Sequence, residues 1–474
     1  MKFDRTKIIA TLGPASNNAE TLTEMVKAGL DVCRLNFSHG THDEHEKNIQ
    51  LVRKVAAEQK TNLGVLVDLQ GPKLRVGMMQ NDGVFLIPGE KIILSTDESI
   101  GNAEKLYLNY YNLARDVQPG EKILLDDGKI ELQVISSNKK NEVECEIIYG
   151  GKLLSKKGVN FPNTKLSIPS ITDKDKLDLL FGLKHDVEWI GLSFVRSADD
   201  ILELKKLIAA QGKHTRVIAK IEKPEGVHNI DEIIEVADAI MVARGDMGVE
   251  LDMEKVPIIQ KTIVRKCIKH SKPVIIATQM MESMINSPTP TRAETNDVTN
   301  AVLDGADAVM LSAETSIGKY PSIVVEKMRR IVHYAEMQEP VYRKNKKLNP
   351  NSITHLSDEV CFHATLLADT LGARAIVGMT VSGYSAFKIS SYRPHAPIFI
   401  FTNQMQLLNM VNLIWGVRGI YYDRNVGTDE TFAEVNSILK QQGYVTDGDI
   451  IINTASMPVG ELGRTNAIKV SVVK

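Results

Sequence analysis

The chain is poor in cysteine and has no excess of charge of either sign. Its 474 residues include four cysteines, none of them in a C-x-x-C pair, which argues against a zinc site or a disulfide framework and favours a reducing compartment. The 57 basic and 59 acidic residues give a net charge of −2. With charges so nearly balanced, the protein surface as a whole is not expected to attract nucleic acid or an anionic membrane. Any basic site must therefore be local.

Long hydrophobic runs are also missing. Residues 1–5 carry no apolar signal segment, and no stretch of about 18 consecutive apolar residues occurs anywhere. We therefore expect a cytoplasmic protein that is neither exported nor bound to a membrane. The chain does contain 43% hydrophobic and 24% charged residues, which is ordinary for a globular protein, and its length suffices for about three domains.

Eight short apolar runs, each followed by a segment of helical periodicity, form the strongest pattern in the chain. Strands buried on both faces need continuous apolar runs, and parallel pairing between them needs crossovers. Eight such units predict a (β/α)8 TIM barrel, with an open doubly wound sheet as the alternative. The runs occupy residues 7–12, 32–36, 64–68, 189–194, 216–221, 239–243, 273–278 and 308–312.

The regular spacing breaks between the third and fourth runs. The interval 72–164 predicts short strands and turns, including Pro-Gly-Glu-Lys-Ile at both 88–92 and 119–123, and hence a small β-barrel domain. Because it follows a barrel strand, this domain is expected to lie over the barrel mouth as a lid.

A polar, basic linker precedes a second series of apolar runs near the C-terminus. The linker includes residues 343–347, and the later runs predict an open α/β domain. The expected division is a barrel domain of residues 1–71 and 165–342, a β-barrel lid of residues 72–164, and a C-terminal α/β regulatory domain of residues 343–474.

Polar and charged side chains follow the predicted barrel strands at the end that faces the mouth. Because the carboxyl ends of all eight strands meet there, these side chains are expected to share one site. They are Arg34, Asn36, Ser38, Asp68, Lys73, Arg75, Lys220, Glu222, Asp246, Thr278, Ser312 and Glu314.

This set has the chemistry of phosphoryl transfer. Glu222 and Asp246 could supply two hard oxygen ligands to Mg²⁺, which keeps its other positions for water and substrate oxygens. Arg34, Arg75 and Lys220 add the positive charge that a transferring phosphoryl group needs around its oxygens.

Seven motifs give the chain a specific resemblance, because they occur in one order and at one spacing. The chain resembles the pyruvate kinase family along essentially its whole length, which implies transfer of the phosphoryl group of phosphoenolpyruvate to ADP, giving pyruvate and ATP. The motifs are NFSHG at 36–40, GPKLR at 71–75, KGVN at 157–160, KIE at 220–222, ARGD at 243–246, ATQM at 277–280 and LSAET at 311–315.

The resemblance implies a role for each matching residue. Lys220 would stabilise the transferring phosphoryl group and the enolate oxygen, and Arg34 would hold the phosphoryl group. Glu222 and Asp246 would bind Mg²⁺ or Mn²⁺. The backbone N–H groups of Gly245 and Asp246 would bind the substrate carboxylate, and Thr278 would lie on the side of the substrate that is protonated. Ser312 and Glu314 would form a supporting polar network. The nucleotide would be contacted by Asn36, His39, Arg75 and Lys157.

One departure from the family concerns a monovalent cation. Many members bind potassium through residues matching Asn36, Ser38, Asp68 and the carbonyl of Leu69, and carry glutamate where this chain has Lys73. A fixed ammonium repels a second cation nearby. The expectation is that Lys73 takes the place of the ion and that activity needs no potassium.

The resemblance also implies a homotetramer and an effector site. The loop from Thr380 to Ser385 follows a predicted strand and opens a helix, so it could hold a phosphate. Fructose 1,6-bisphosphate is not favoured, because the loop 458–461 lacks a cationic grip. Ribose 5-phosphate, glucose 6-phosphate, AMP or no activator stay open.

Two other functional classes stay open at this stage. A metal-dependent barrel lyase or aldolase acting on pyruvate or phosphoenolpyruvate would also stabilise an enolate. A scaffold protein without activity would need none of Lys220, Glu222 and Asp246. Two tempting motifs have plainer explanations: His39, His42 and His45 suit a charged helix start, and the methionines of 280–284 suit barrel packing.

Overall fold

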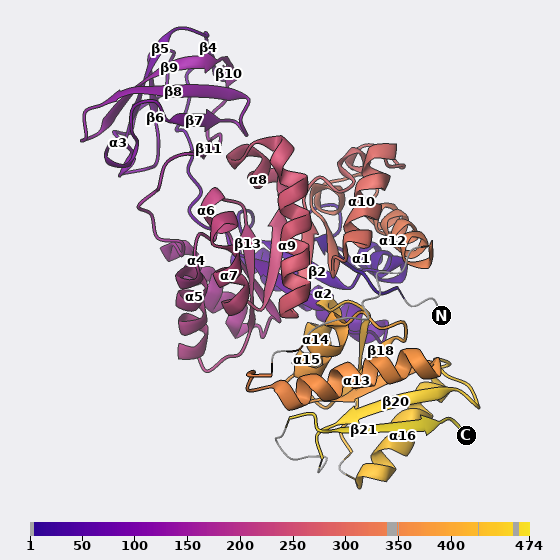
Figure 1. Cartoon of the computed structure of the whole chain (residues 1–474). Coiled ribbons are helices and arrows are strands. Elements are labelled where there is room, and N and C mark those ends of the chain that lie inside the picture. The colour runs from indigo at the N-terminus through magenta and orange to yellow at the C-terminus, as the bar shows by residue number, and fades with distance from the viewer. Residues whose placement is uncertain (1–3, 339–347, 349, 425, 458–463) are drawn as a thin grey trace.

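The computed structural model describes residues 4–338, 348, 350–424, 426–457 and 464–474. A central barrel domain carries a lid that projects from its upper end and a C-terminal domain at its lower end (Figure 1). Among the described residues, no helix is both long and apolar enough to span a membrane. The predicted linker 343–347 and the loop 458–461 lie outside the described residues.

Eight parallel strands form the predicted barrel. They are β1 (Lys7–Thr11), β2 (Val32–Asn36), β3 (Gly64–Asp68), β12 (Trp189–Leu192), β13 (Arg216–Ile221), β14 (Ala239–Ala243), β15 (Val274–Ala277) and β16 (Ala308–Leu311). Their hydrogen bonds close the ring in the order β1-β16-β15-β14-β13-β12-β3-β2. The (β/α)8 barrel is therefore confirmed, and the open doubly wound sheet is wrong.

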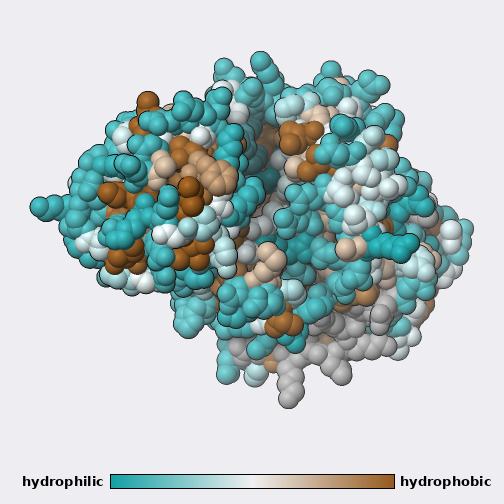
Figure 2. All heavy atoms as spheres, turned by 90° about the horizontal axis from the view of Figure 1, so that it is seen from above, coloured by the Kyte–Doolittle hydropathy of each residue, from teal (hydrophilic) through white to brown (hydrophobic). Residues whose placement is uncertain are grey.

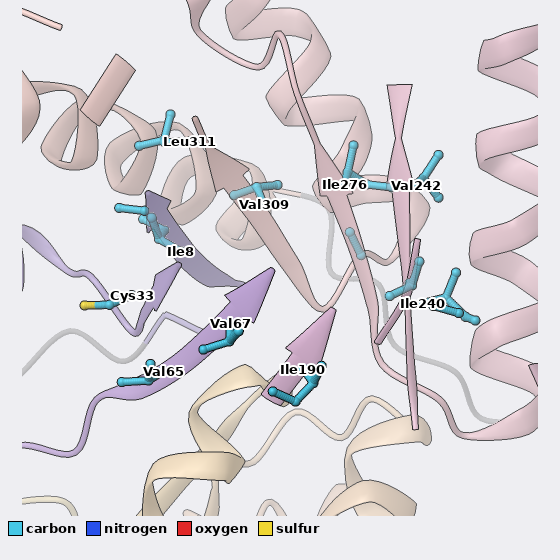
Figure 3. Packing of buried hydrophobic residues seen from close by; sticks show 14 of the residues in the cluster. Ile8, Cys33, Val65, Val67, Ile190, Ile240, Val242, Ile276, Val309 and Leu311 are labelled. Carbon is cyan, nitrogen blue, oxygen red and sulfur yellow. The ribbon is translucent and has the colours of Figure 1, made fainter. Parts of the chain in front are cut away.

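Alternate residues of the strands enter two different cores, which is why the runs are continuous. Ile8 and Val65 belong to the core between strands and helices, part of which Figure 3 shows. Ile9 and Leu66 belong to a second core, which continues through residues such as Leu413 into the C-terminal domain. Both faces of each strand are thus removed from water.

Helices surround the barrel, and several begin with side-chain caps. Thr41, Thr172, Ser197 and Thr291 each form a capping box with the third residue of the helix that follows. The helices are α1 (Ala19–Ala28), α2 (His42–Glu58), α4 (Asp173–Lys184), α5 (Ala198–Ala210), α6 (Pro224–His228), α7 (Ile230–Val236), α8 (Arg244–Glu250), α9 (Val256–His270), α10 (Arg292–Asp304), α11 (Ala313–Ser316) and α12 (Pro321–Gln338), with 3-10 turns at Met253–Lys255 and Glu282–Ile285.

The lid follows β3 and is almost entirely β-structure. It contains β4 (Val84–Leu86), β5 (Lys91–Ser95), β6 (Lys105–Tyr107), α3 (Leu113–Asp116), β7 (Lys122–Leu125), β8 (Ile130–Ser137), β9 (Glu142–Tyr149), β10 (Gly151–Leu153) and β11 (Val159–Asn160). These strands surround one hydrophobic core. Their ladders do not close as a single barrel, because β10 and β4 form a two-stranded sheet apart from the six-stranded sheet β11-β7-β8-β9-β5-β6.

The C-terminal domain is the predicted open α/β sheet. Its elements are α13 (His355–Leu371), β17 (Ala375–Met379), α14 (Tyr384–Ser391), β18 (Ile398–Thr402), α15 (Met405–Met410), a 3-10 turn (Val411–Leu413), β19 (Val417–Tyr421), α16 (Thr428–Gln441), β20 (Ile450–Ala455) and β21 (Ala467–Val472). The sheet order is β19-β18-β17-β20-β21, and β21 alone runs antiparallel to its neighbour.

A buried ion pair fastens this domain to the barrel floor. Arg393 is 2% exposed and donates hydrogen bonds of 3.0 and 2.9 Å to the two carboxylate oxygens of Asp307, which precedes β16. The same guanidinium lies over the ring of Trp415, at 4.8 Å from its centroid. A planar guanidinium suits this bidentate and stacked geometry. The C-terminal domain is thus bound to the floor of the barrel, and the lid lies at the opposite end (Figure 1).

Candidate active site

Lys220, the penultimate residue of β13, lies at the centre of a buried ion network. Its Nζ donates to Ser193 Oγ at 2.6 Å and lies 3.1 Å from Asp68 Oδ1 and 3.1 Å from Glu222 Oε1. These groups follow the neighbouring strands β12, β3 and β13, which bring their carboxyl ends together. The predicted meeting of these side chains at one end of the barrel is observed for this group.

Arg34, on the adjacent β2, joins the network through Asp68. Its Nε donates to Asp68 Oδ2 at 2.8 Å, and a second nitrogen donates to Thr11 Oγ1 at 2.9 Å. One carboxylate therefore holds two cations, Arg34 and Lys220. Positive charge concentrated by a buried acid at a barrel mouth is suited to binding an anion.

Burial and charge shift the pKa values of these groups in opposite directions. Burial alone would raise the pKa of Asp68, but Lys220 and Arg34 hold it below its usual value. Burial alone would lower the pKa of Lys220, but Asp68 and Glu222 raise it overall, so its ammonium stays charged at neutral pH. Glu222 differs from both, because burial outweighs its pairing with Lys220 and raises its pKa to about 7.

Glu222 and Asp246 fit a divalent cation as a pair of carboxylates. Asp246 is close enough to raise the pKa of Glu222 by charge repulsion. Glu222 is buried, with Oε1 3.1 Å from Lys220 Nζ, and its Oε2 accepts the N–H of Phe194 at 2.7 Å. No cluster of three or more histidine, cysteine or acidic ligands occurs in the described part of the chain, so substrate and water would complete a magnesium shell.

Thr278, just beyond β15, lies against the start of α8. Its Oγ1 accepts the backbone N–H of Gly245 at 2.7 Å, and its carbonyl accepts a hydrogen bond of 2.8 Å from Arg244. Thr278 and Gln279 both have left-handed backbones, with φ of 67° and 53°. A β-branched residue in that region is strained, and such strain is typical of functional sites.

Ser312 and Glu314 form a separate polar group after β16. Glu314 accepts the backbone N–H groups of Ser312 at 2.6 Å and Met281 at 3.2 Å. Burial raises the pKa of Glu314, although these backbone donors oppose the shift. Ser312 Oγ is buried without a hydrogen-bond partner among the residues described. Glu314 thus shapes the backbone of this turn.

Three of the four oxygen groups expected at a potassium site already serve other partners. Asn36 Oδ1 accepts the N–H of Ser38 at 3.1 Å, the carbonyl of Leu69 accepts Ser193 Oγ at 2.7 Å, and Asp68 binds Arg34 and Lys220.

Lys73 lies in the segment between β3 and β4, and it lines the cavity between lid and barrel. Its pKa is lowered, first by burial and then by the charges of Arg75 and Lys220, whereas Asp246 and Asp127 oppose the shift. Lys73 thus interacts electrostatically with Asp246, and among the described residues it forms no ion pair with Asp68.

The expected nucleotide contacts come from both sides of the mouth. Arg75 donates to the carbonyl of Lys156 at 2.7 Å, and Lys157 Nζ lies 2.7 Å from Asp126 Oδ1, so both cations are anchored within the lid. On the barrel side, burial followed by the charges of Lys73, Arg75 and Arg34 lowers the pKa of His39. Figure 2, seen from above, shows a recess between the lid and the rest of the barrel domain.

The plainer explanations of two motifs are confirmed. His42 begins α2, and His45, on the same helix, stacks on Phe37 with ring centroids 4.0 Å apart. Met280 and Met284 are buried in the barrel core.

Sequence reasoning missed Ser193 and Thr11 as partners of Lys220 and Arg34. Thr11 is the last residue of β1 and Ser193 follows β12, so both lie at the same end of the barrel as the other residues. It also missed the ion pair in which Arg244 lies 2.7 Å from Asp297 of α10, which only the packing of that helix reveals.

Comparison with known proteins agrees with this site. Residues 3–325 match the family described as "Pyruvate kinase, barrel domain", and residues 358–471 match "Pyruvate kinase, alpha/beta domain". The chain belongs to the pyruvate kinase family. Pyruvate kinases transfer the phosphoryl group of phosphoenolpyruvate to ADP in glycolysis, so the chain is a phosphotransferase. The barrel-domain match includes every predicted site residue from Arg34 to Glu314.

Individual relatives extend the similarity over nearly the whole chain. A pyruvate kinase of Staphylococcus haemolyticus (strain JCSC1435) is 44% identical over 475 residues, which cover 99% of this chain and 80% of the relative. Pyruvate kinases of Staphylococcus epidermidis (strain ATCC 12228 / FDA PCI 1200) and Staphylococcus aureus (strain MRSA252) are each 44% identical over 474 residues with the same coverage. The chain thus spans about four-fifths of the length of these pyruvate kinases.

Proposed function

We propose that the barrel mouth transfers the phosphoryl group of phosphoenolpyruvate to ADP with Lys220 and Arg34 as its charged catalytic groups. The observation that carries this proposal is the buried network in which one Lys220 ammonium is 3.1 Å from both Asp68 and Glu222. Lys220 stabilises the phosphoryl group in transfer and the enolate oxygen left behind, and Arg34 holds the phosphoryl group. Such fixed charges need no rearrangement when negative charge develops.

The remaining barrel residues position the substrate. The N–H groups of Gly245 and Asp246 bind its carboxylate, for which Thr278 Oγ1 must give up the Gly245 N–H that it now accepts. Thr278 then faces the methylene carbon that is protonated, with water as a possible proton source. Ser312 and Glu314 hold the neighbouring turn.

Glu222 and Asp246 are proposed to hold Mg²⁺ or Mn²⁺. A divalent cation there supplies positive charge for the substrate oxygens and offsets the repulsion between the two carboxylates. Glu222 must lose its proton for this binding. The rise in its pKa therefore links metal affinity to pH.

We predict that metal affinity falls in acid. Since the pKa of metal-free Glu222 is about 7, a proton competes with the cation below that pH, and Mn²⁺ affinity should fall about tenfold between about pH 8 and about pH 6. Electron paramagnetic resonance titration of Mn²⁺ measures this directly. Glu222→Gln should bind Mn²⁺ weakly and lose most of the pH dependence, whereas the exposed Glu254→Gln should keep both properties. A flat affinity in the unmodified protein would contradict the prediction.

The lid is proposed to bind the nucleotide. Arg75 and Lys157 meet the phosphates of ADP from the lid, and His39 and Asn36 meet them from the barrel. Closure of the lid would also exclude water from a reactive enolate.

Regulation is proposed to occur at the loop from Thr380 to Ser385 in the C-terminal domain. Ser385 Oγ is buried without a hydrogen-bond partner in the described structure, at the start of α14 and in the loop from Thr380 to Ser385, which supports a phosphorylated effector there. A cavity of about 930 Å³ adjoins this loop, with Ser382, Tyr384 and Lys388 in its lining. The division into domains at residues 71, 164 and 342, the homotetramer and the cytoplasmic location stay predictions.

One assay separates this function from the alternative of a lyase or aldolase. Pyruvate formation from phosphoenolpyruvate and Mg²⁺ should require ADP and should produce ATP in equal amount. Pyruvate formation that is unchanged when ADP is omitted would overturn the assignment in favour of the lyase.

A further inference from the structure

Glu250, the last residue of α8, binds two donors from different parts of the molecule. Its side chain is buried, and Oε1 accepts a hydrogen bond of 2.7 Å from Lys223 Nζ and another of 2.7 Å from Asn160 Nδ2. Lys223 belongs to the barrel, whereas Asn160 belongs to β11 of the lid. One carboxylate oxygen therefore joins the two domains.

The three partners also lie next to the proposed ligands of metal and nucleotide. Lys223 directly follows Glu222, and Glu250 follows Asp246 by one helical turn in α8. Asn160 is three residues beyond Lys157 in the same lid segment. A shift of the lid that moves Asn160 must therefore pull on the helix that carries Asp246, because Glu250 belongs to that helix.

Both charged and apolar side chains surround this cluster at the hinge. A cavity of about 80 Å³ opens beside it between lid and barrel, with Lys73, Asp127 and Asp246 in its lining. Glu250 Oε2 is buried and has no hydrogen-bond partner among the described residues. Directional bonds, and not close packing alone, thus set the position of β11 against α8.

On the other strand of the hinge, Arg196 plays a comparable part. It donates to the carbonyls of Leu166 and Ile168 at 3.0 and 2.9 Å. The Arg196 side chain, which follows barrel strand β12, thus binds the backbone of the segment that returns from the lid, and these bonds involve neither Glu222 nor Asp246. Glu250 is the contact that reaches the helix of a proposed metal ligand.

We propose that Glu250 is a positioning residue that couples the lid to the metal carboxylates, with Asn160 as its lid partner and Lys223 as its barrel partner. Nucleotide binding under the lid and metal binding in the barrel then strengthen each other through this carboxylate. The proposal rests on the proposed function in one respect, the placement of ADP under the lid.

The test compares Asn160→Ala, Lys223→Met and the double variant. Asn160→Ala should raise KM for ADP about tenfold and leave KM for phosphoenolpyruvate within about twofold, because only the lid loses its anchor. Lys223→Met should weaken Mn²⁺ binding, measured without substrates by electron paramagnetic resonance. Because both donors share Glu250 Oε1, the double variant should raise KM for ADP by less than the product of the single effects.

A matched control is Lys266→Met, which removes a partly buried lysine that pairs with Asp231 and should change none of these quantities. The coupling would be overturned if Asn160→Ala raised KM for ADP and KM for phosphoenolpyruvate equally. It would also be overturned if the double variant raised KM for ADP by the full product of the single effects. Arg75→Met and Lys157→Met test the underlying premise separately. If neither raises KM for ADP, the placement of the nucleotide fails whatever Asn160→Ala does.

Discussion

Replacement of Lys220 with alanine is expected to lower the rate of pyruvate formation about a thousandfold. The ammonium is buried, stays charged at neutral pH and lies between two carboxylates at the point where the strands converge. Arg34 does not replace it, because Arg34 is already fixed on Asp68. Steady-state assay with saturating substrates and Mg²⁺ measures the loss as a fall in kcat.

The same replacement leaves Asp68 and Glu222 without their common partner, so stability must be measured beside activity. We expect some loss of thermal stability, because two buried carboxylates then repel each other. Lys220→Arg keeps the charge and should recover much of the stability but little of the rate, since the geometry at the phosphoryl group differs. Lys261→Ala, at a partly buried pair with Asp304 on the helices outside the barrel, is the control. A Lys220→Ala protein that is folded and fully active would remove the central residue from the proposed mechanism.

Pyruvate formation is expected to proceed at similar rates, within about twofold, with potassium or with tetramethylammonium as the sole monovalent cation. The reason is the charge of Lys73, together with the hydrogen bonds that already engage Asn36, Leu69 and Asp68. A positive charge on Lys73 opposes the binding of a second cation near it.

The decisive variant is Lys73→Glu. It should lose at least about tenfold in rate in tetramethylammonium and recover most of it in potassium, because the ion can then supply the missing charge. Lys73→Met should form pyruvate more slowly in both salts, and potassium should restore its rate less than that of Lys73→Glu. The comparison separates the effect of losing the ammonium from the effect of gaining a carboxylate. Strong activation of the unmodified protein by potassium would refute the role of Lys73 and leave the assignment of the enzyme intact.

Local chemistry made the barrel predictable. Each strand had to be apolar on both faces, so the eight runs were visible without any knowledge of partners, and all eight are strands of the closed ring. The polar residues at the ends of the runs were predictable for a related reason. The carboxyl ends of all the parallel strands meet at the barrel mouth, so charged side chains at these ends lie together there. Lys220, Asp68, Glu222 and Arg34 were found in this way.

The lid shows where such reasoning fails. Its short strands were predicted, but the division into a six-stranded and a two-stranded sheet was not, because register and pairing depend on contacts between distant segments. Lys223 had no signal of its own, and Asn160 was noticed only as part of the KGVN motif, because neither residue shows in the sequence that it binds the buried carboxylate of Glu250.

The sequence by itself determined the architecture and the inventory of the site. Apolar periodicity and the seven motifs were sufficient for the barrel, the inserted lid, the C-terminal sheet and the family. Only the tertiary structure decided the pairing of charges: that Asp68 serves both Arg34 and Lys220, that Glu222 has a raised pKa, and that Glu250 joins lid and barrel. The physical reason is that burial and the distance between charges set their energies, and both arise only when separate strands converge.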